Sequence, residues 1–382
     1  RLPTVSASQA LQNIQNRGAR PISTGLSQLN RILSPSGLPG RNVEGGLVRG
    51  KVTEVYGPSG VGKTAFGIQA AVNALREGYH VVWVDAAAPL VAQRFGDVLF
   101  SKPSISVTGP SPPDDAAPAL SPDELQSHFH HYTAPTLAHV LALFVHPPAS
   151  FPPPNTSLIV IDSLSTLFDN AYPRSTDDRT VRSKTDQTRW AGGRKFAVIN
   201  DLISKLARLA ALHDIALLLT CQTITRIRGG SRALLVPAIS GAEWENGVST
   251  RLVLFRDWVP AQGKYSDANA ASDIDRLRKA RFVGVVKANG VTFAEEGGVG
   301  NVVPFAVDLN GLCDLDFAAG DIAAPPAVNP SPVKPRKRLH AEIADSEDED
   351  PDSSELYGWV ENDEVAAEGL LVDEAALEVA NE

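Results

Sequence analysis

The chain alternates between two patterns of hydrophobic residues. Short, almost wholly apolar runs are separated by longer stretches in which apolar residues recur at helical spacing. The first pattern is typical of strands buried on both faces, and the second of amphipathic helices. The runs lie at 52–56, 81–85, 158–162, 214–222, 251–256 and 281–287, and the helical stretches include 63–77 and 194–212. This alternation predicts an α/β fold with a mainly parallel central sheet flanked by helices.

A glycine-rich segment joins the first apolar run to the first helical stretch. It has the phosphate-loop motif G-x-x-x-x-G-K-[ST], formed by Gly57, Pro58, Ser59, Gly60, Val61, Gly62, Lys63 and Thr64. In this motif, backbone N–H groups at a helix N-terminus surround phosphates, the lysine adds positive charge and the hydroxyl binds Mg²⁺. A plain glycine turn is the alternative, but the strand before the segment and the helix after it favour the motif. The sequence therefore predicts a nucleoside triphosphate site.

The run at 158–162 is apolar except for its last residue, Asp162. A carboxylate at the end of a buried parallel strand lies at the sheet edge where α/β proteins bind ligands. A carboxylate that only caps the strand is the other explanation. Because the phosphate loop precedes it, we expect Asp162 to hold Mg²⁺ through water, together with Thr64.

Composition divides the chain into a lead-in, a core and a tail. The lead-in, residues 1–50, contains a short helical pattern at 21–33 that we expect to dock on the sheet. The predicted nucleotide-binding core covers 51–316. Two Pro- and Ser-rich stretches inside it, near 101–122 and 147–154, are expected to be surface loops around a small strand and helix.

The predicted tail, residues 317–382, is rich in Pro, Ala and charged residues, and we expect it to be disordered because it cannot bury enough apolar surface to fold alone. A basic cluster at 332–338 precedes residues 341–382, which hold 16 of the 44 Asp and Glu residues and no Lys or Arg. Three explanations of the basic cluster are open: a nuclear localisation signal, a nucleic-acid contact or plain solvated charge. We favour the first and expect a nuclear protein.

Composition also argues against several classes of protein. Cys221 and Cys313 lack the spacing of metal ligands or of a disulfide framework, which favours a reducing compartment. No apolar run is long enough to span a bilayer and no signal-peptide pattern opens the chain, so we expect a soluble intracellular protein with no membrane partner. Methionine is absent, even at position 1, so we expect that the natural chain begins upstream.

Histidines gather at 128–131, where His128, His130 and His131 fall in one short segment. Three neighbouring histidines raise the possibility of a metal site. No acidic residue or cysteine stands at ligand spacing, so we expect partly exposed strand positions instead.

These segments, taken in order, resemble the RecA-type recombinase family in its eukaryotic and archaeal form, over about residues 20–315. Residues 22–26, followed by Leu29 and Asn30, are similar to a segment before the family's core, and residues 52–57 to the strand that enters its phosphate loop. The resemblance implies a RecA-like P-loop NTPase core that uses ATP and Mg²⁺.

The resemblance also implies roles for single residues. Gln222 stands where the family has a glutamine that senses the γ-phosphate and relays to a DNA-binding loop, so Lys63 and Gln222 are the implied catalytic residues. Arg94 stands where family members often stack an arginine on adenine. Residues 250–252 match a segment that follows the DNA-binding loop.

Two basic stretches, about 172–190 and 223–243, fall where the family places its DNA-contacting loops. Flexible basic loops suit single-stranded DNA, because phosphate contacts supply most of the affinity without reading sequence. Without the resemblance, each stretch would be interpreted as a solvated loop. The candidate DNA-binding residues are Arg174, Arg179, Arg182, Arg189, Arg226, Arg228 and Arg232.

One position departs from the family's pattern. Active recombinases carry a glutamate two residues beyond the aspartate that ends the third core strand, where it orients the attacking water. Here Asp85 is followed by Ala86, Ala87 and Ala88. Because Ala87 cannot act as a base, we expect nucleotide binding to persist and hydrolysis to be weak. This feature resembles the recombinase paralogues, which assist the main recombinase.

The leading hypothesis is a nuclear recombinase paralogue acting in homologous-recombination repair of double-strand breaks. The resemblance implies that it binds ATP and single-stranded DNA and assists filament assembly in a hetero-oligomer with other RecA-type subunits. Two alternatives stay open. One is a competent DNA-dependent ATPase that performs strand exchange, and the other is an interaction scaffold in which ATP only stabilises the fold.

Overall fold

The computed structural model describes residues 21–34, 45–101, 122–172, 186–228, 232–256 and 280–315. Within these ranges the backbone alone is described at 122–123, 186–192, 227–228 and 232–233. The chain divides into two units, residues 1–324 and 325–382, and every described residue belongs to the first. The predicted disordered tail and most of the first Pro-rich stretch therefore lie outside the described residues.

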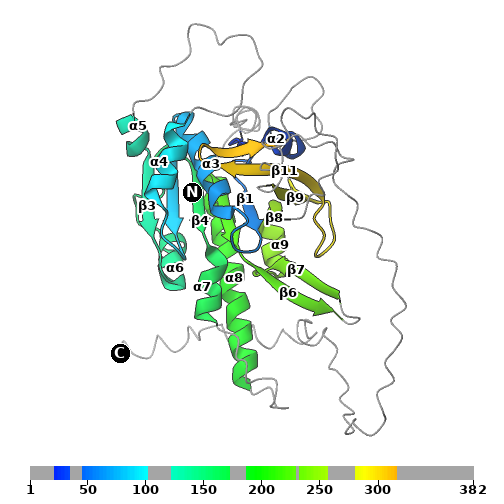
Figure 1. The fold of residues 1–382 in the computed structure, drawn as a ribbon. Helices are drawn as coiled ribbons and strands as arrows, with labels where there is room; N and C mark the ends of the chain where they lie inside the picture. Colours follow the sequence, from blue (N-terminus) through cyan, green and yellow to red (C-terminus); the bar gives the residue numbers. More distant parts are fainter. Residues whose placement is uncertain are drawn as a thin grey trace, which may run out of the picture. The chain divides into compact units, whose positions relative to one another are not determined.

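A mixed ten-stranded sheet forms the centre of the described residues (Figure 1). Its strand order is β12-β11-β9-β8-β1-β5-β4-β2-β3, and β10 pairs with β9. The strands are β1 (Val52–Tyr56), β2 (His80–Asp85), β3 (Phe129–Thr133), β4 (Thr156–Asp162), β5 (Ala216–Cys221), β8 (Thr250–Phe255), β9 (Arg281–Ala288), β10 (Val291–Thr292), β11 (Asn301–Asp308) and β12 (Gly311–Asp314).

The sheet has a parallel part and an antiparallel part. From β8 through β1, β5, β4 and β2 to β3, every pairing is parallel. The pairings of β9 with β8, β10 and β11, and of β11 with β12, are antiparallel. The predicted mainly parallel sheet is confirmed, and the β9–β12 set extends it at one edge.

Helices cover both faces of the sheet, and alternate side chains of each strand pack against opposite faces. Val81 and Trp83 of β2 join the core under α2, α3 and α4, whereas Val82 and Val84 join the core under α6, α7 and α8. This double burial explains why the central parallel strands β2, β4 and β5 are mostly apolar. The helices are α2 (Ser27–Leu33), α3 (Lys63–Arg76), α4 (Ala92–Phe100), α5 (Pro122–Ser127), α6 (Leu137–Val145), α7 (Leu164–Ala171), α8 (Asp186–His213) and α9 (Ala242–Gly247).

The lead-in contacts the same core as α3. Ile22 forms a β-bridge with Leu47, and the side chains of Leu26, Leu29 and Leu33 are buried in the core cluster that contains Phe66 of α3. The helical spacing of these leucines thus places them on the face of α2 that is turned toward the sheet.

Two expectations about loops need correction. Residues 223–243 were expected to be a flexible loop, but most of them form a hairpin of β6 (Thr223–Arg228) and β7 (Arg232–Pro237), which extends away from the large sheet (Figure 1). Runs rich in Thr, Ile, Leu and Val flank Gly229 and Gly230, a composition typical of two strands joined by a turn, which explains the hairpin. The other stretch, 172–190, ends in helix, because α8 already begins at Asp186.

Among the helices of the described residues, none is both long and apolar enough to cross a bilayer.

Candidate nucleotide-binding site

The phosphate-loop segment, residues 57–64, connects β1 to α3 at the carboxyl end of the parallel strands. Gly62 caps α3 with φ of 111°, a left-handed conformation that glycine adopts without a Cβ penalty. A Cβ on Gly57 would lie 2.2 Å from the carbonyl oxygen of Leu254, so glycine is required there to let the loop pass β8. The backbone N–H groups at the start of α3 therefore face the space beyond the sheet edge, as an anion site needs.

Lys63 is turned back onto its own loop. Its Nζ donates to the carbonyl oxygens of Gly57 and Pro58, both at 2.8 Å, and to Oε1 of Gln222 at 3.1 Å. Burial lowers the pKa of Lys63, and the nearby charge of Asp162 opposes this shift. A buried ammonium held only by neutral oxygens and one amide is poised to exchange these contacts for a phosphate.

Thr64 and Asp162 meet at the centre of the site. The Thr64 hydroxyl donates to Oδ2 of Asp162 at 2.6 Å, and the Thr220 hydroxyl donates to Oδ1. A hydroxyl and a carboxylate are the hard oxygen ligands that Mg²⁺ prefers. The residues present therefore fit a magnesium ion, with Thr64 and Asp162 as the groups that would hold it.

Ala87 follows the carboxyl end of β2, next to the strand that carries Asp162. The N–H of Ala86 donates to the carbonyl oxygen of Asp162 at 2.8 Å, and the side chain of Ala87 is exposed. The nearest acidic residue along the chain, Asp85, is buried and already engaged. It accepts from Trp83 Nε1 at 2.9 Å and from the N–H of Leu90, and it lies 2.6 Å from His131 Nε2.

Gln222 lies at the base of the β6–β7 hairpin, between the ends of β5 and β6. Its N–H donates to the Ser165 hydroxyl at 2.8 Å, and its carbonyl accepts from the N–H of Ala238 at 2.9 Å. The Gln222 side chain touches Lys63 while its backbone anchors both strands of the hairpin. A change at the phosphate loop can therefore reach the hairpin through this residue.

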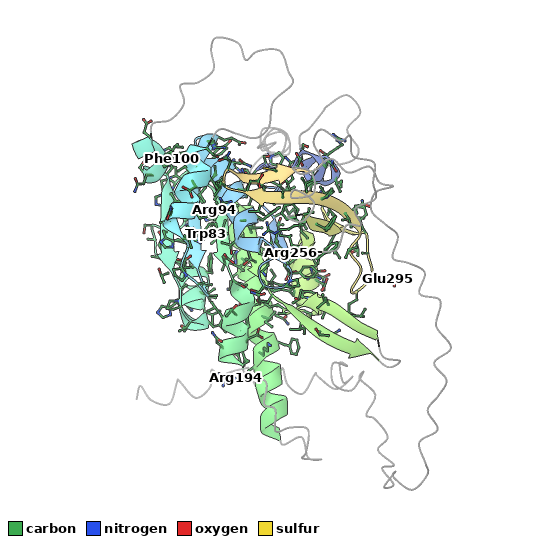
Figure 2. All side chains as sticks on the ribbon, in the orientation of Figure 1. Trp83, Arg94, Phe100, Arg194, Arg256 and Glu295 are labelled. Carbon is green, nitrogen blue, oxygen red and sulfur yellow. The ribbon has the colours of Figure 1, made fainter. Side chains whose placement is uncertain are left out.

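Arg94 of α4 contacts the turn between β11 and β12 (Figure 2). Its guanidinium donates to the carbonyl oxygens of Leu309, at 2.6 Å, and Asp308. A pocket of about 300 Å³ is lined by Arg94, Val307, Asp308 and Leu309. A Cβ on Gly62 would lie 3.5 Å from Val307, so this pocket borders the phosphate loop.

With this geometry in place, comparison with known proteins identifies the family. The family model described as ATPase: KaiC matches residues 22–92. The DNA repair protein rhp55 of Schizosaccharomyces pombe is 26% identical over 249 residues, with 55% of this chain and 69% of rhp55 covered. The DNA repair and recombination protein RadB of Halobacterium salinarum is 30% identical over 213 residues, with 56% of this chain and 76% of RadB covered. The chain belongs to the RecA-type recombinase family.

A third relative of the same kind is the DNA repair protein RAD51 homolog 3 of Cricetulus griseus, which is 26% identical over 223 residues, with 55% of each chain covered. The family membership that the sequence motifs predicted is confirmed. The names of these relatives support a role in recombination repair for the chain. Membership of the RecA-type family also implies nucleotide use, usually with Mg²⁺, which agrees with the Lys63, Thr64 and Asp162 geometry.

The predicted DNA-binding residues of this RecA-type chain are only partly described. Arg174, Arg179 and Arg182 lie outside the described residues. Only the backbone is described for three others: Arg189 in α8, and Arg228 and Arg232, which pair with each other in the hairpin. The described side chain is that of Arg226, whose Nη1 lies 2.5 Å from Oε1 of Glu296.

Three further residues at the site were not identified from the sequence. The Thr220 hydroxyl donates to Asp162, and the Ser165 hydroxyl accepts from the backbone N–H of Gln222. Arg281 lies beside Gly62. A hydroxyl inside the apolar β5 run was the available signal for Thr220, because β5 pairs with β4 and ends beside it. Ser165 and Arg281 reach the site through tertiary packing and carry no local signal.

The histidines lie along β2 and β3. His80 Nδ1 is 3.1 Å from His130 Nε2, and the His80 and His128 rings stack with centroids 4.3 Å apart. Within the described residues, no group of three or more His, Cys, Asp or Glu side chains is arranged to hold a metal ion. Cys221 is a buried free thiol, and the Cys313 thiol donates to Oδ2 of Asp308 at 3.4 Å.

Proposed function

We propose that this chain is an ATP-binding recombinase paralogue that acts in the nucleus in homologous-recombination repair of DNA double-strand breaks. It binds single-stranded DNA and assists recombinase filament assembly in a hetero-oligomer with other RecA-type subunits. ATP with Mg²⁺ serves mainly as a conformational ligand, and hydrolysis is weak.

One combination of residues carries this proposal. At the carboxyl ends of β1, β4 and β5, Lys63 contacts Gln222, and the adjacent Thr64 contacts Asp162. Beside them, Ala87 offers no group that could orient a water molecule. The engagement of Asp85 with Trp83, Leu90 and His131 argues against its replacing the missing base. Since positioning supplies much of the rate of phosphoryl transfer, a site with this composition should bind ATP and hydrolyse it slowly.

The DNA-binding part of the proposal depends on the hairpin. Gln222 joins the phosphate site to β6, which carries Arg226 and Arg228. Basic residues on an extended hairpin suit the phosphate backbone of single-stranded DNA. The nuclear location depends on the basic cluster at 332–338, and the hetero-oligomer on the resemblance to recombinase paralogues.

Two other functions compete with this one. A strand-exchange enzyme would need a carboxylate from elsewhere, such as a neighbouring subunit, and would turn over ATP rapidly when DNA is added. An interaction scaffold would use ATP only to stabilise the fold, so Lys63→Ala would leave its assembly with partner subunits intact. The proposed mediator requires that Lys63→Ala weaken this assembly.

The decisive experiment measures ATP binding and turnover by the purified chain, with and without single-stranded DNA. Lys63→Ala should weaken ATP binding by about tenfold or more, because it removes a charge-assisted contact. Ala87→Glu should raise turnover, whereas Ala88→Glu adds the same charge one exposed residue later and should not. Rapid DNA-stimulated turnover by the wild type would instead favour the strand-exchange enzyme.

A further inference from the structure

Arg281 stands at the start of β9, and its side chain reaches the phosphate loop. A Cβ built on Gly62 would lie 3.6 Å from Cδ of Arg281 and 3.9 Å from its Nε. Gly62 is the residue directly before Lys63 and the N-cap of α3. The guanidinium group of Arg281 therefore lies near the N-terminus of α3, which would face a bound phosphate chain.

This guanidinium has no compensating partner in the part of the chain that the structure describes. Its Nε is buried and makes no hydrogen bond, and no carboxylate there lies within ion-pair distance of Arg281. A buried charged donor without an acceptor is costly, so such donors usually have a ligand or a water. Burial lowers the pKa of Arg281, and the like charge of Arg256 lowers it further.

Arg251, which is more deeply buried than the half-buried Arg281, shows how the fold can compensate this charge with carboxylates, although its Nη2 also lacks a partner. Arg251 is 6% exposed, and it lies 2.6 Å from Oε2 of Glu54 and 2.5 Å from Oε1 of Glu245. Arg281 has a like-charged neighbour, Arg256, instead of two carboxylates. Lys63, which directly follows Gly62, has only neutral oxygen atoms as hydrogen-bond partners. Two cations thus converge on one loop without an anion between them.

We propose that Arg281 is a nucleotide-binding residue whose guanidinium donates to the phosphate chain of the nucleotide held by residues 57–64. It approaches from the β9 side, so that the phosphates lie between Arg281 and Lys63. This inference rests on the proposed nucleotide binding. It adds a contact that the phosphate-loop motif does not contain, supplied by a strand more than two hundred residues further along the chain.

The test compares Arg281→Gln and Arg281→Lys with the wild type. The control variant is Arg31→Gln, which removes one positive charge from an exposed position on α2. Each protein is titrated with MgATP and with magnesium tripolyphosphate, which has phosphates but no nucleoside. Arg281→Gln should weaken both ligands by about tenfold or more, because a hydrogen bond to a charged group is lost. Arg281→Lys should lose less affinity than Arg281→Gln, and Arg31→Gln should match the wild type.

A second measurement separates a ligand contact from a structural role. If Arg281 lacks a partner before nucleotide binds, Arg281→Gln should leave the melting temperature of the nucleotide-free protein unchanged or raise it. The same variant should reduce the stabilisation that MgATP confers, which follows ligand affinity. Unchanged affinity for both ligands would overturn the inference, as would a loss confined to MgATP, which would assign the contact to the nucleoside. A wild type that binds neither ligand would overturn the proposed function as well.

Discussion

Asp162 is the residue on which the two halves of the nucleotide site meet. One oxygen accepts from Thr64 of the phosphate loop, and the other accepts from Thr220 of the neighbouring strand β5. These two hydrogen bonds fix the orientation of the Asp162 carboxylate. The oxygens that would hold a metal ion are therefore pre-oriented, which would reduce the ordering that binding must impose.

Replacing this carboxylate should uncouple nucleotide from metal. We expect Asp162→Asn to lower the affinity for ATP in the presence of Mg²⁺ by roughly tenfold or more, since a charged ligand of the ion is lost. The affinity without Mg²⁺ should change little. Titrations with ATP at fixed Mg²⁺ and in EDTA measure both quantities, and Asp169→Asn, an exposed position on α7, is the matched control. An equal Mg²⁺ dependence in wild type and Asp162→Asn would contradict the assignment.

The stacked histidines at the β2–β3 edge should make stability depend on pH. Burial lowers the pKa of His80 and of His130, and neighbouring histidines add to the effect. The unfolded chain then binds protons more readily than the folded one below about pH 6.5. The free energy of unfolding should therefore be greatest above that pH and decrease as the pH falls toward the lowered folded-state pKa values.

Urea unfolding at pH 7.5, 6.5 and 5.5 tests this expectation. His80→Gln should lose less stability than the wild type over this range, because one of the paired imidazoles no longer titrates. His146→Gln removes an exposed histidine and should retain the wild-type slope. The two variants also keep the same carboxylates, so any difference between their slopes comes from the histidines. Equal slopes would mean that the His80 cluster does not titrate in this window.

At the scale of elements, the β6–β7 hairpin is attached to the body of the fold at its base and along one side. Its base contains Gln222, and farther out Arg226 pairs with Glu296 and Leu234 packs on Gly297. Glu296 and Gly297 belong to the segment between β10 and β11. A phosphate that binds Arg226 must compete with Glu296, because both present oxygens to the same guanidinium.

The competition predicts opposite effects of two charge removals on DNA affinity. We expect Glu296→Gln to strengthen binding of single-stranded oligo-dT a few-fold at low salt, and Arg226→Gln to weaken it. Glu295→Gln makes the same change in net charge at the adjacent residue and should have a smaller effect. Fluorescence anisotropy at two salt concentrations gives the affinities and their salt dependence. If Glu295→Gln and Glu296→Gln strengthened binding equally, net charge rather than the ion pair would be the cause.

At the scale of the whole molecule, one buried ionic cluster joins segments that are far apart in sequence. Glu54 of β1 is fully buried; it accepts from Arg251 of β8 at 2.6 Å and from Trp244 Nε1 of α9 at 3.2 Å. Burial acts to lower the pKa of Arg251, but Glu54 and Glu245 more than offset this and hold it above the ordinary value. The cluster therefore locks α9, which follows the hairpin, to the strand that leads into the phosphate loop.

Removing the buried member of this cluster should destabilise the protein strongly. We expect Glu54→Gln to lower the free energy of unfolding by about 3–5 kcal/mol, because Arg251 is left buried with an incomplete partner. Glu245 has a side chain that is 46% exposed, so Glu245→Gln should cost at most about 1 kcal/mol. Urea denaturation of both variants measures the difference, and similar losses would show that the burial of Glu54 does not control the cost.

The sequence predicted the parts of this molecule that local pattern determines. Strands buried on both faces are mostly apolar, so β1, β2 and β4 could be located to within two residues, even though β1 carries the buried Glu54. The phosphate loop has its own motif, and Asp162 was found because it ends an apolar strand. These features need no knowledge of which distant segments meet.

Other features could not be predicted, because they depend on long-range contacts or on weak local patterns. Arg226 and Glu296 are 70 residues apart, and Arg94 and Leu309 are 215 apart. The sequence predicts helix only from Arg194, because Gly192 and Gly193 lower helix propensity just before the apolar period begins, whereas α8 begins at Asp186. The runs on either side of Gly229 and Gly230 have the composition of strands, but neither alternates strictly, so periodicity alone does not predict the hairpin.

The position of Gln222 has a thermodynamic consequence. β6 begins at Thr223, directly after Gln222, so no flexible linker separates the hairpin from the Gln222 side-chain amide that contacts Lys63. If Lys63 exchanged Gln222 Oε1 for a phosphate, the free energy of that exchange would be shared with the hairpin's conformation. Linkage is reciprocal, so DNA that favours the same hairpin conformation must tighten ATP by the same factor by which ATP tightens DNA. Even without turnover, each ligand would then reinforce the other.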